Sequence, residues 1–211
     1  MTSPYPDRSL NKIYDLLFCD DLELFRSPEA TGDVSVSPWK ELFDELTTAD
    51  ELRSLVFAEG SEARTRALAA MRLREIGQPI TDKLLFGTVI EVGMETGLDA
   101  LAAYADGTIR YINHSGSLCA WDARTDRSDE LVGELLDASR SVVSQIGPWE
   151  GQRLGPPANG KARMTFLVSD GLYFGEGPFE ALARDPIGGR VIAAGFQIMT
   201  FLLQHQTARS E

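Results

Sequence analysis

Alternating apolar and polar residues in the middle of the chain predict a β-sheet. Successive side chains of a strand point to opposite faces, so this alternation gives each strand one face that can be buried. Asp106-Gly107 lies between two such segments and tolerates the positive φ of a two-residue hairpin turn. Short connections favour an antiparallel meander over parallel strands with helical crossovers. The four expected strands cover residues 84–92, 98–105, 108–113 and 118–121.

A second hairpin is expected near the carboxyl end. Segments 163–168 and 172–174 are rich in apolar residues, and Ser169-Asp170-Gly171 separates them with the same turn chemistry. Between the meander and this hairpin, segment 149–161 contains several Gly and Pro residues. We expect a long loop there without regular structure of its own, and long loops are often functional.

Helical spacing and capping signals account for the rest of the chain. Small residues in the middle of the last, mostly apolar helix permit a close approach to the sheet or to a second copy of the chain. Before residue 80 we expect helices that begin at Ser9 (continuing through Leu24), at Ser37-Pro38, at the capping box Thr48 to Glu51, and at Ser61. After the meander we expect helices that begin at Ser128, at Gly177-Pro178 and at Asp185-Pro186.

The order of these elements predicts an α+β fold. An N-terminal helical segment is followed by an antiparallel sheet, built as a four-strand meander, a helix, a hairpin and a last helix, with helices packed on one face. The boundary falls near residue 80, which gives a helical segment at 1–80 and an α+β domain at 81–211. One continuous domain is the alternative, because 211 residues suit a single sizeable core.

Charge changes this picture by excluding some partners. The formal net charge is −12, and both halves of the chain are acidic, so phosphate backbones and anionic membrane surfaces are disfavoured. The only basic cluster is Arg64, Arg66, Arg72 and Arg74, whose positions step around a predicted helix, which favours a solvated face. We expect no nucleic-acid or membrane partner. The start of the chain resembles no secretory leader, so the expected location is the cytoplasm.

Cysteine and histidine usage predicts neither a disulfide nor a metal centre. Cys19 and Cys119 are expected to be reduced and packed as small hydrophobic residues. The two histidines belong to no metal-ligand spacing. Glu91, Glu95 and Asp99 could form an oxygen-rich site, but ordinary solvation of the turn between them is favoured. We expect no cofactor.

Two clusters of polar residues are the candidates for chemistry. Tyr111, Asn113, His114 and Ser115 lie at one strand end, and Ser169, Asp170, Tyr173 and Glu176 lie in the second hairpin. If the clusters meet, a histidine beside a carboxylate and hydroxyl groups suits acid–base or nucleophilic work. The alternative is that Asn, His, Ser and Asp satisfy the backbone of their own turns, and this is favoured.

Two resemblances accompany these patterns. The segments LLFGTVIEVG, GLDALAAYADGTIRYINHSG and VSDGLYFGEGP are similar to those of a family of uncharacterised bacterial cytoplasmic proteins, over about the last two-thirds of the chain. This resemblance implies no activity and transfers no site residue. The order of elements and the acidic charge also resemble the small, dimeric chaperones of bacterial secretion systems, without a shared motif.

The sequence therefore favours a binding or protein-interaction module without cofactor, acting as a homodimer. The alternative is a small-molecule enzyme, most plausibly a hydrolase, that uses His114 with Asp170 or Glu176. The two hypotheses differ in geometry, because the enzyme requires that residues 111–115 and 169–176 meet in one pocket.

Overall fold

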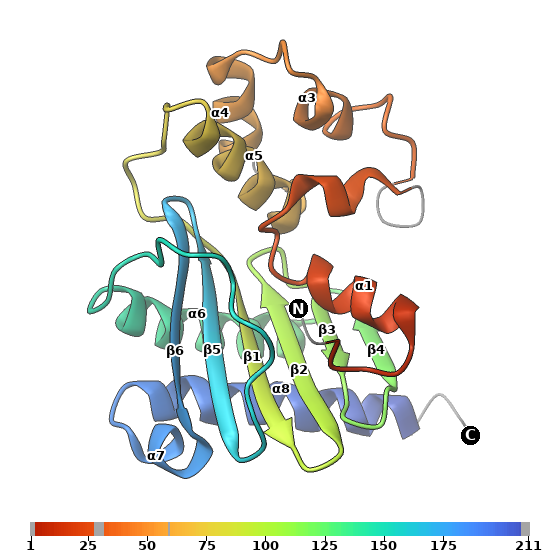
Figure 1. Ribbon diagram of the computed structural model, residues 1–211, viewed down its shortest axis with the longest axis vertical. Helices are drawn as coiled ribbons and strands as arrows, with labels where there is room; N and C mark the ends of the chain where they lie inside the picture. Colours follow the sequence, from red (N-terminus) through yellow and green to blue (C-terminus); the bar gives the residue numbers. More distant parts are fainter. Residues whose placement is uncertain (1–2, 28–31, 59, 208–211) are drawn as a thin grey trace.

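A six-stranded antiparallel sheet forms the centre of the protein (Figure 1). The structure is a computed structural model that describes residues 3–27, 32–58 and 60–207. Its strand order is β4-β3-β2-β1-β5-β6, so the meander and the second hairpin join through the β1–β5 pair. The strands are β1 (Leu85–Met94), β2 (Gly97–Tyr104), β3 (Ile109–Ile112), β4 (Leu118–Trp121), β5 (Lys161–Val168) and β6 (Gly171–Pro178). The predicted α+β class, the meander and both hairpins are confirmed.

The helices surround this sheet from both sides and from one end. In the described part of the chain they are α1 (Arg8–Leu16), the 3-10 helix η1 (Leu22–Arg26), α3 (Trp39–Phe43), α4 (Ala49–Phe57), α5 (Ala63–Glu75), α6 (Asp126–Val143), α7 (Phe179–Arg184) and α8 (Gly188–Thr207). Helices α3, α4 and α5 form a group at the end of the sheet where β1 begins (Figure 1). They share one hydrophobic core with α1 and with the adjacent face of the sheet.

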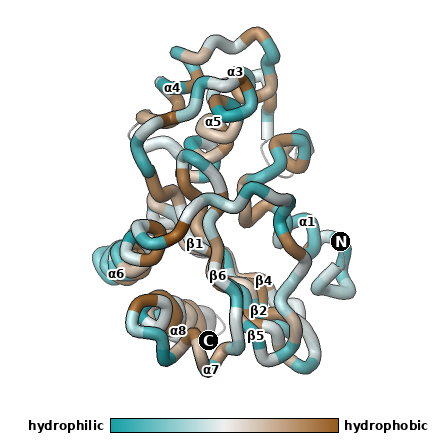
Figure 2. The backbone as a smooth tube through the Cα atoms, turned by 60° about the vertical axis from the view of Figure 1, so that its left-hand side comes forward, coloured by the Kyte–Doolittle hydropathy of each residue, from teal (hydrophilic) through white to brown (hydrophobic). Residues whose placement is uncertain are grey.

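Helices α6 and α8 cover the other face of the sheet, as the sequence predicts. They lie side by side, and hydrophobic residues of α8 and of the adjacent strands pack in one core (Figure 2). Each face of the sheet has its own hydrophobic core. Val89 and Ile90 are adjacent in β1 but belong to different cores, because successive side chains of a strand point to opposite faces. Within the described residues, we find no helix with the length and apolar character needed to span a bilayer.

The face opposite α6 and α8 is also covered, by α1 and by residues 144–160, which we call the crossing loop. Tyr5 and Tyr14 reach the sheet from the N-terminal segment, where the Tyr5 hydroxyl donates to the Leu98 carbonyl at 3.0 Å. In the crossing loop, Trp149 packs edge-on against Phe174 of β6 with ring centroids 5.0 Å apart. The predicted long loop is therefore a packed layer on the sheet.

Several predicted helix starts differ from the structure. Thr48 and Glu51 form the expected capping box of α4. Ser61 does not cap α5, because Glu62 occupies the N-cap position without a side-chain bond. The α6 helix begins before Ser128, since Thr125 is the N-cap and Ser128 completes a reciprocal box with it. The residue that caps is thus three positions upstream of the one expected.

The first expected helix is split in two. Helix α1 ends at Leu16, and η1 begins only at Leu22. Between them Cys19 has a φ of 50°, a left-handed conformation that interrupts α-helix geometry. Cys19 and Cys119 are both buried and form no disulfide with each other.

The arginines of α5 do not form a solvated face, so that prediction is wrong. Arg66 donates to the Val56 carbonyl at 2.8 Å, and Arg74 donates to the Ser169 carbonyl at 2.8 Å. Arg72 donates to the Leu42 carbonyl, and Arg64 pairs with Glu62. Because α5 is surrounded by α3, α4 and the sheet, each step around its circumference meets another element. Arg66, Arg72 and Arg74 bind α5 to its neighbours, whereas Arg64 pairs with the N-cap residue of α5 itself.

Candidate functional site

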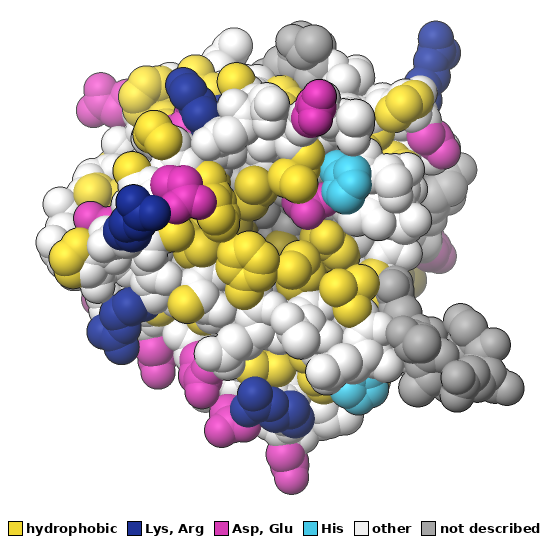
Figure 3. Space-filling model, turned by 90° about the horizontal axis from the view of Figure 1, so that it is seen from below, with side chains coloured by type: hydrophobic (Ala, Val, Ile, Leu, Met, Phe, Trp, Pro, Cys, Tyr) yellow, Lys and Arg dark blue, Asp and Glu magenta, His cyan; other side chains and the backbone are white. Residues whose placement is uncertain are grey.

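A cavity of about 540 Å³ lies between α8 and the sheet. Ligand sites typically occupy 300–1,000 Å³ and are mostly apolar with a few polar groups. Seen from the end of the molecule opposite α3 and α4, hydrophobic side chains line a hollow on this face, with histidine and acidic side chains beside it (Figure 3). We call it the α8 cavity. Its lining includes Ile90, Val92, Met94, Glu95, Asp99, Leu101, Tyr111, Asn159, Phe179, Ile192, Gly195, Phe196 and Met199.

The spacing of the chain explains how these side chains converge. On α8, Ile192, Gly195, Phe196 and Met199 follow helical spacing and therefore share one face. On the sheet, Ile90, Leu101 and Tyr111 are register partners across β1, β2 and β3, so they stand in a row. The cavity is the space that this row and the helix face leave between them.

Gly195 allows α8 to approach the sheet closely. A Cβ atom at this position would lie 2.5 Å from Ile90 Cδ1 and 3.6 Å from Leu101 Cδ2. The nearer atom is the far end of a flexible side chain, so a methyl group at Gly195 would push Ile90 into the cavity. The size of the cavity therefore depends on a residue without a side chain.

The polar part of the site is Asp99 with His114 and Tyr111. Asp99 Oδ1 accepts from the His114 backbone N–H at 2.6 Å and lies 3.0 Å from His114 Nδ1. Its side chain is 21% exposed and that of His114 is 42% exposed. Burial, together with the charge and hydrogen bond of Asp99, raises the pKa of Tyr111. A carboxylate that accepts from Nδ1 leaves Nε2 of His114 as the nitrogen that can accept a proton.

The position of His114 follows from the turn between β3 and β4. Asn113 Oδ1 accepts from the backbone N–H groups of Ser115 and Ser117 at 3.1 and 2.8 Å, which fixes the turn. Gly97 has a φ of 149°, and a Cβ there would lie 2.4 Å from the His114 carbonyl oxygen. In the first predicted cluster, Tyr111 lines the cavity, and His114 contacts Asp99, which also lines it. Asn113 and Ser115 instead form hydrogen bonds within their own turn.

The second predicted cluster does not meet the first. His114 follows β3, at the end of the sheet where β1 ends, whereas Asp170 lies in the β5–β6 turn, beside the start of β1 (Figure 1). The ten residues of β1 separate these ends by about 30 Å, at 3.3 Å per residue. Glu176 lies nearer to His114 along the direction of the strands, but β2, β1 and β5 lie between β3 and β6. The structure therefore brings His114 together with neither Asp170 nor Glu176.

The residues of the second cluster have structural partners. The Ser169 hydroxyl donates to the Asp82 carbonyl at 2.5 Å and accepts from the Leu84 N–H at 3.0 Å, which fixes the entry to β1. The Tyr173 hydroxyl donates to Asp170 Oδ2 at 2.8 Å. Turn chemistry, the alternative in the sequence, accounts for these contacts.

Glu176 belongs to a charged ladder on the face under α1 and the crossing loop. Arg163 in β5 lies between Glu91 of β1 and Glu176 of β6, with nitrogen–oxygen distances of 3.6 Å and 2.6 Å. Glu91 is fully buried and accepts from the Tyr14 hydroxyl at 2.6 Å. Arg163 also donates to the carbonyl of Gly155 in the crossing loop at 2.7 Å.

Burial and the neighbouring charges shift the pKa values of the two carboxyl groups of this ladder in opposite directions. Burial raises the pKa of Glu91, although the Tyr14 hydrogen bond and the Arg163 charge lower it in part. Burial also opposes ionisation of Glu176, but its hydrogen bonds with Arg163 and Lys161 bring the pKa below 4.5. Glu91 and Asp99 lie on opposite faces of the sheet, because Asp99 is the register partner of Val92, the residue after Glu91. The oxygen-rich site of Glu91, Glu95 and Asp99 is therefore not formed. Among the described residues no group of three His, Cys, Asp or Glu side chains is placed to hold a metal ion.

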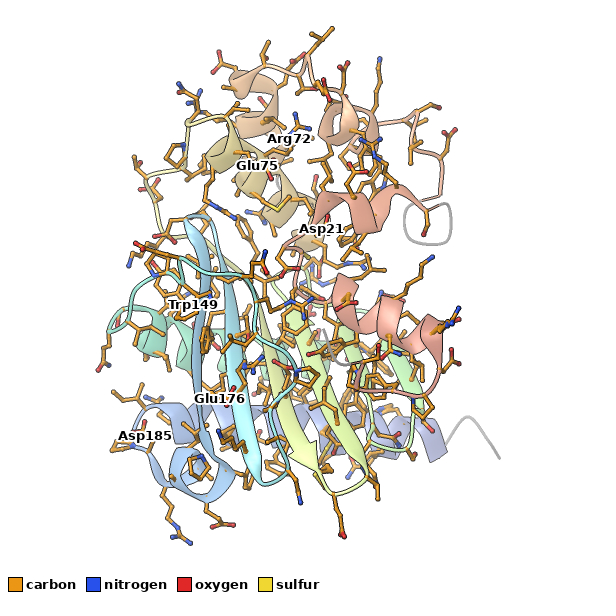
Figure 4. All side chains as sticks on the ribbon, viewed as in Figure 1. Asp21, Arg72, Glu75, Trp149, Glu176 and Asp185 are labelled. Carbon is orange, nitrogen blue, oxygen red and sulfur yellow. The ribbon has the colours of Figure 1, made fainter. Side chains whose placement is uncertain are left out.

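A larger cavity of about 960 Å³ lies between η1, α5 and the crossing loop, and it is the weaker candidate. Asp21 before η1, Arg72 and Glu75 of α5, and Trp149 of the crossing loop border it (Figure 4). One of its cations, Arg153, has a side chain that is 8% exposed and is paired with Asp15 and Asp20 at 2.9 and 2.8 Å. The charges here bind the N-terminal helices to the crossing loop, and this accounts for them.

Asp99 was not predicted to be the partner of His114, and Arg163 was not predicted to be buried. The sequence contained a signal for Asp99, because the alternation of side chains along the paired strands places Asp99 and Tyr111 on the same face of the sheet. A signal for Arg163 was also present, since Glu91 and Arg163 are charged residues within apolar strands. No protein-family model matches this sequence, and a search of curated proteins finds no significant match.

Proposed function

We propose that this protein is a binding module that takes up a small amphipathic molecule in the α8 cavity. The observation that carries the proposal is a mostly apolar cavity of about 540 Å³ with a hydrogen-bonded polar group, Asp99 with His114 and Tyr111, on one side. An apolar ligand body would contact Ile90, Leu101 and Met199, and its polar end would lie at Asp99. The role needs no cofactor.

Gly195→Ala tests this proposal with little cost to the fold. The new methyl group displaces the end of Ile90 into the cavity. We expect the affinity for the neutral probe 4-phenyl-1-butanol to fall by roughly tenfold, because about 1.4 kcal/mol, the scale of overpacking by a methyl group, is tenfold in affinity. The measurement is displacement of the neutral dye Nile red, followed by fluorescence.

Gly133→Ala on α6 is the matched control. It makes the same substitution in a helix, but no atom lies within 4 Å of the position of its Cβ. Both variants gain about 0.5–1 kcal/mol from helix propensity. Only Gly195→Ala is expected to weaken binding. Equal affinity in the two variants would place the ligand outside the α8 cavity, and a probe that binds neither variant nor the wild type would refute the proposal.

Hydrolysis in the same cavity is a second candidate, favoured by the 3.0 Å contact between Asp99 Oδ1 and His114 Nδ1. Nε2 of His114 would take a proton from water as its oxygen attacks an ester carbonyl, and would return the proton to the leaving alcohol. For p-nitrophenyl butyrate, His114→Ala is then expected to lower the rate at least 100-fold, the scale of general base catalysis. His205→Ala, which alters the other histidine of the chain, is the control. A rate that is equal in the two variants would exclude this role for His114.

The homodimer and the protein-interaction role remain predictions. Phe196 and Leu203 lie seven residues apart on α8, and both are exposed by more than 45%. A helix face of this kind is compatible with a second copy of the chain.

A further inference from the structure

The charge around the α8 cavity is negative. Two carboxylates, Glu95 and Asp99, are among its lining residues. No lysine or arginine is among the described residues that line it. A cavity with walls of low polarity and one sign of charge concentrates ions of the opposite sign.

The negative charge of Asp99 is not balanced by a permanent cation. Its ion-pair partner is His114, which carries a charge only when protonated. Its other donors, the His114 backbone N–H and the Tyr111 hydroxyl, are neutral. Glu95 is exposed in the β1–β2 turn and has no ion-pair partner among the described residues. Arg163 and Lys161, the cations of the neighbouring strand, pair with Glu176 on the opposite face.

Aromatic rings supply the second requirement for a cation. Tyr111, Phe179 and Phe196 line the cavity, and the rings of Phe179 and Phe196 meet edge to face with centroids 6.1 Å apart. The faces of aromatic rings attract ammonium groups, and such groups of rings recognise organic cations in other proteins. The aliphatic residues Ile90 and Leu101 leave room beside them for a hydrocarbon body.

We propose that the ligand of the α8 cavity is an organic ammonium ion with a hydrophobic body. This inference rests on the proposed binding function and specifies its ligand class. The ammonium group lies between the carboxylates of Glu95 and Asp99 and the aromatic rings, and the hydrophobic body lies against β1, β2 and α8. An anionic ligand with the same body is disfavoured because its charge would face the same two carboxylates.

Three probes that share one body and differ in the charge of the head group test the proposal. They are 4-phenylbutylamine, which is cationic at neutral pH, the neutral 4-phenyl-1-butanol and the anionic 4-phenylbutanoate. Titration calorimetry with the whole chain is expected to show the amine binding roughly tenfold more tightly than the alcohol, a difference of about 1.4 kcal/mol. The anion is expected to bind more weakly than the alcohol. Added salt should reduce the advantage of the amine, because the charges are partly exposed.

Glu95→Gln separates a local effect from the general acidity of the chain. It removes one charge at the cavity without altering the contact between Asp99 and His114. Glu134→Gln removes the same charge from an exposed position of α6 and is the control. The amine should lose at least half of its advantage over the alcohol in Glu95→Gln and keep it in Glu134→Gln.

The outcomes distinguish the ligand class from the binding function. Equal affinity for the amine and the alcohol, or tighter binding of the anion, would overturn the ammonium proposal and leave the binding function standing. An equal loss in Glu95→Gln and Glu134→Gln would also overturn it, because the preference would then come from net charge alone. Failure of all three probes to bind would overturn both proposals.

Discussion

Arg163→Met is expected to lower the free energy of unfolding by about 3–5 kcal/mol, the usual cost of removing one partner of a buried ion pair. The arginine side chain is 3% exposed, and it holds Glu91 and Glu176 from one position in β5. Without it, Glu91 retains the Tyr14 hydrogen bond but loses its nearest positive charge. Urea unfolding followed by circular dichroism measures the loss. Arg190→Met, at an exposed position of α8, is the control and should change stability by less than about 0.5 kcal/mol.

The loss should depend on pH in a definite direction. Burial already raises the pKa of Glu91, so ionising it on the way to neutral pH costs stability, and removing Arg163 increases that cost. The pKa of Glu176 is lowered by Arg163, so this pair contributes stability above the ordinary value of 4.5 and loses it as the pH falls through the lowered value. Both effects make the Arg163→Met deficit larger at neutral pH than at pH 4.5. A deficit that is the same at both pH values would show that the ladder is held by packing rather than charge.

Arg153→Ala is expected to detach the crossing loop from the N-terminal helices. Its side chain is 8% exposed, pairs with Asp15 and Asp20, and lies over the ring of Phe18 at 4.0 Å. Burial raises the pKa of Asp20, and Arg153 lowers it in part, so the variant leaves a half-buried carboxyl group without its cation. Because Asp15 is 37% exposed and screened by solvent, the expected loss is roughly 2–3 kcal/mol rather than the full cost of a buried pair.

Two measurements check the role of Arg153. Chemical unfolding gives the stability, and limited proteolysis should cleave residues 149–160 faster in the variant than in the wild type. Arg140→Ala is the control, because Arg140 pairs with Asp137 at an exposed position of α6. If Arg153→Ala were as stable and as resistant as Arg140→Ala, the crossing loop would be held by Trp149 and its backbone contacts instead.

Local patterns in the sequence were sufficient to predict the strands and the two hairpins, but not the order of the strands in the sheet. The turn chemistry of Asp106-Gly107 and Asp170-Gly171 is set by neighbouring residues, and both hairpins form where these pairs occur, between β2 and β3 and between β5 and β6. The helix starts were less predictable, since more than one residue near each start can cap. Thr125 and Ser128 both take part in the start of α6, and only the structure shows which one is the N-cap.

The candidate site was only partly predictable, because its pairings cross the sheet. His114 and Tyr111 were recognised as chemistry-bearing residues, but the order of the strands decides which carboxylate lies beside them. The β1–β5 pairing moves Asp170 and Glu176 away and leaves Asp99, from the neighbouring strand β2, in contact with His114. The hydrogen bond from Arg74 to the Ser169 carbonyl was also not predictable, since it depends on where α5 lies relative to the sheet. Contacts between distant segments are not encoded in local periodicity.

The methionines of the chain offer the most direct test of the α8 cavity. Met94 and Met199 line it, whereas Met71 lies on α5 and Met164 faces Gly188 at the start of α8. In protein labelled with ¹³C at the methionine methyl groups, titration with 4-phenyl-1-butanol should shift the NMR signals of Met94 and Met199 and leave that of Met71 in place. A shift of Met71 with unchanged Met94 and Met199 signals would contradict ligand binding between α8 and the sheet.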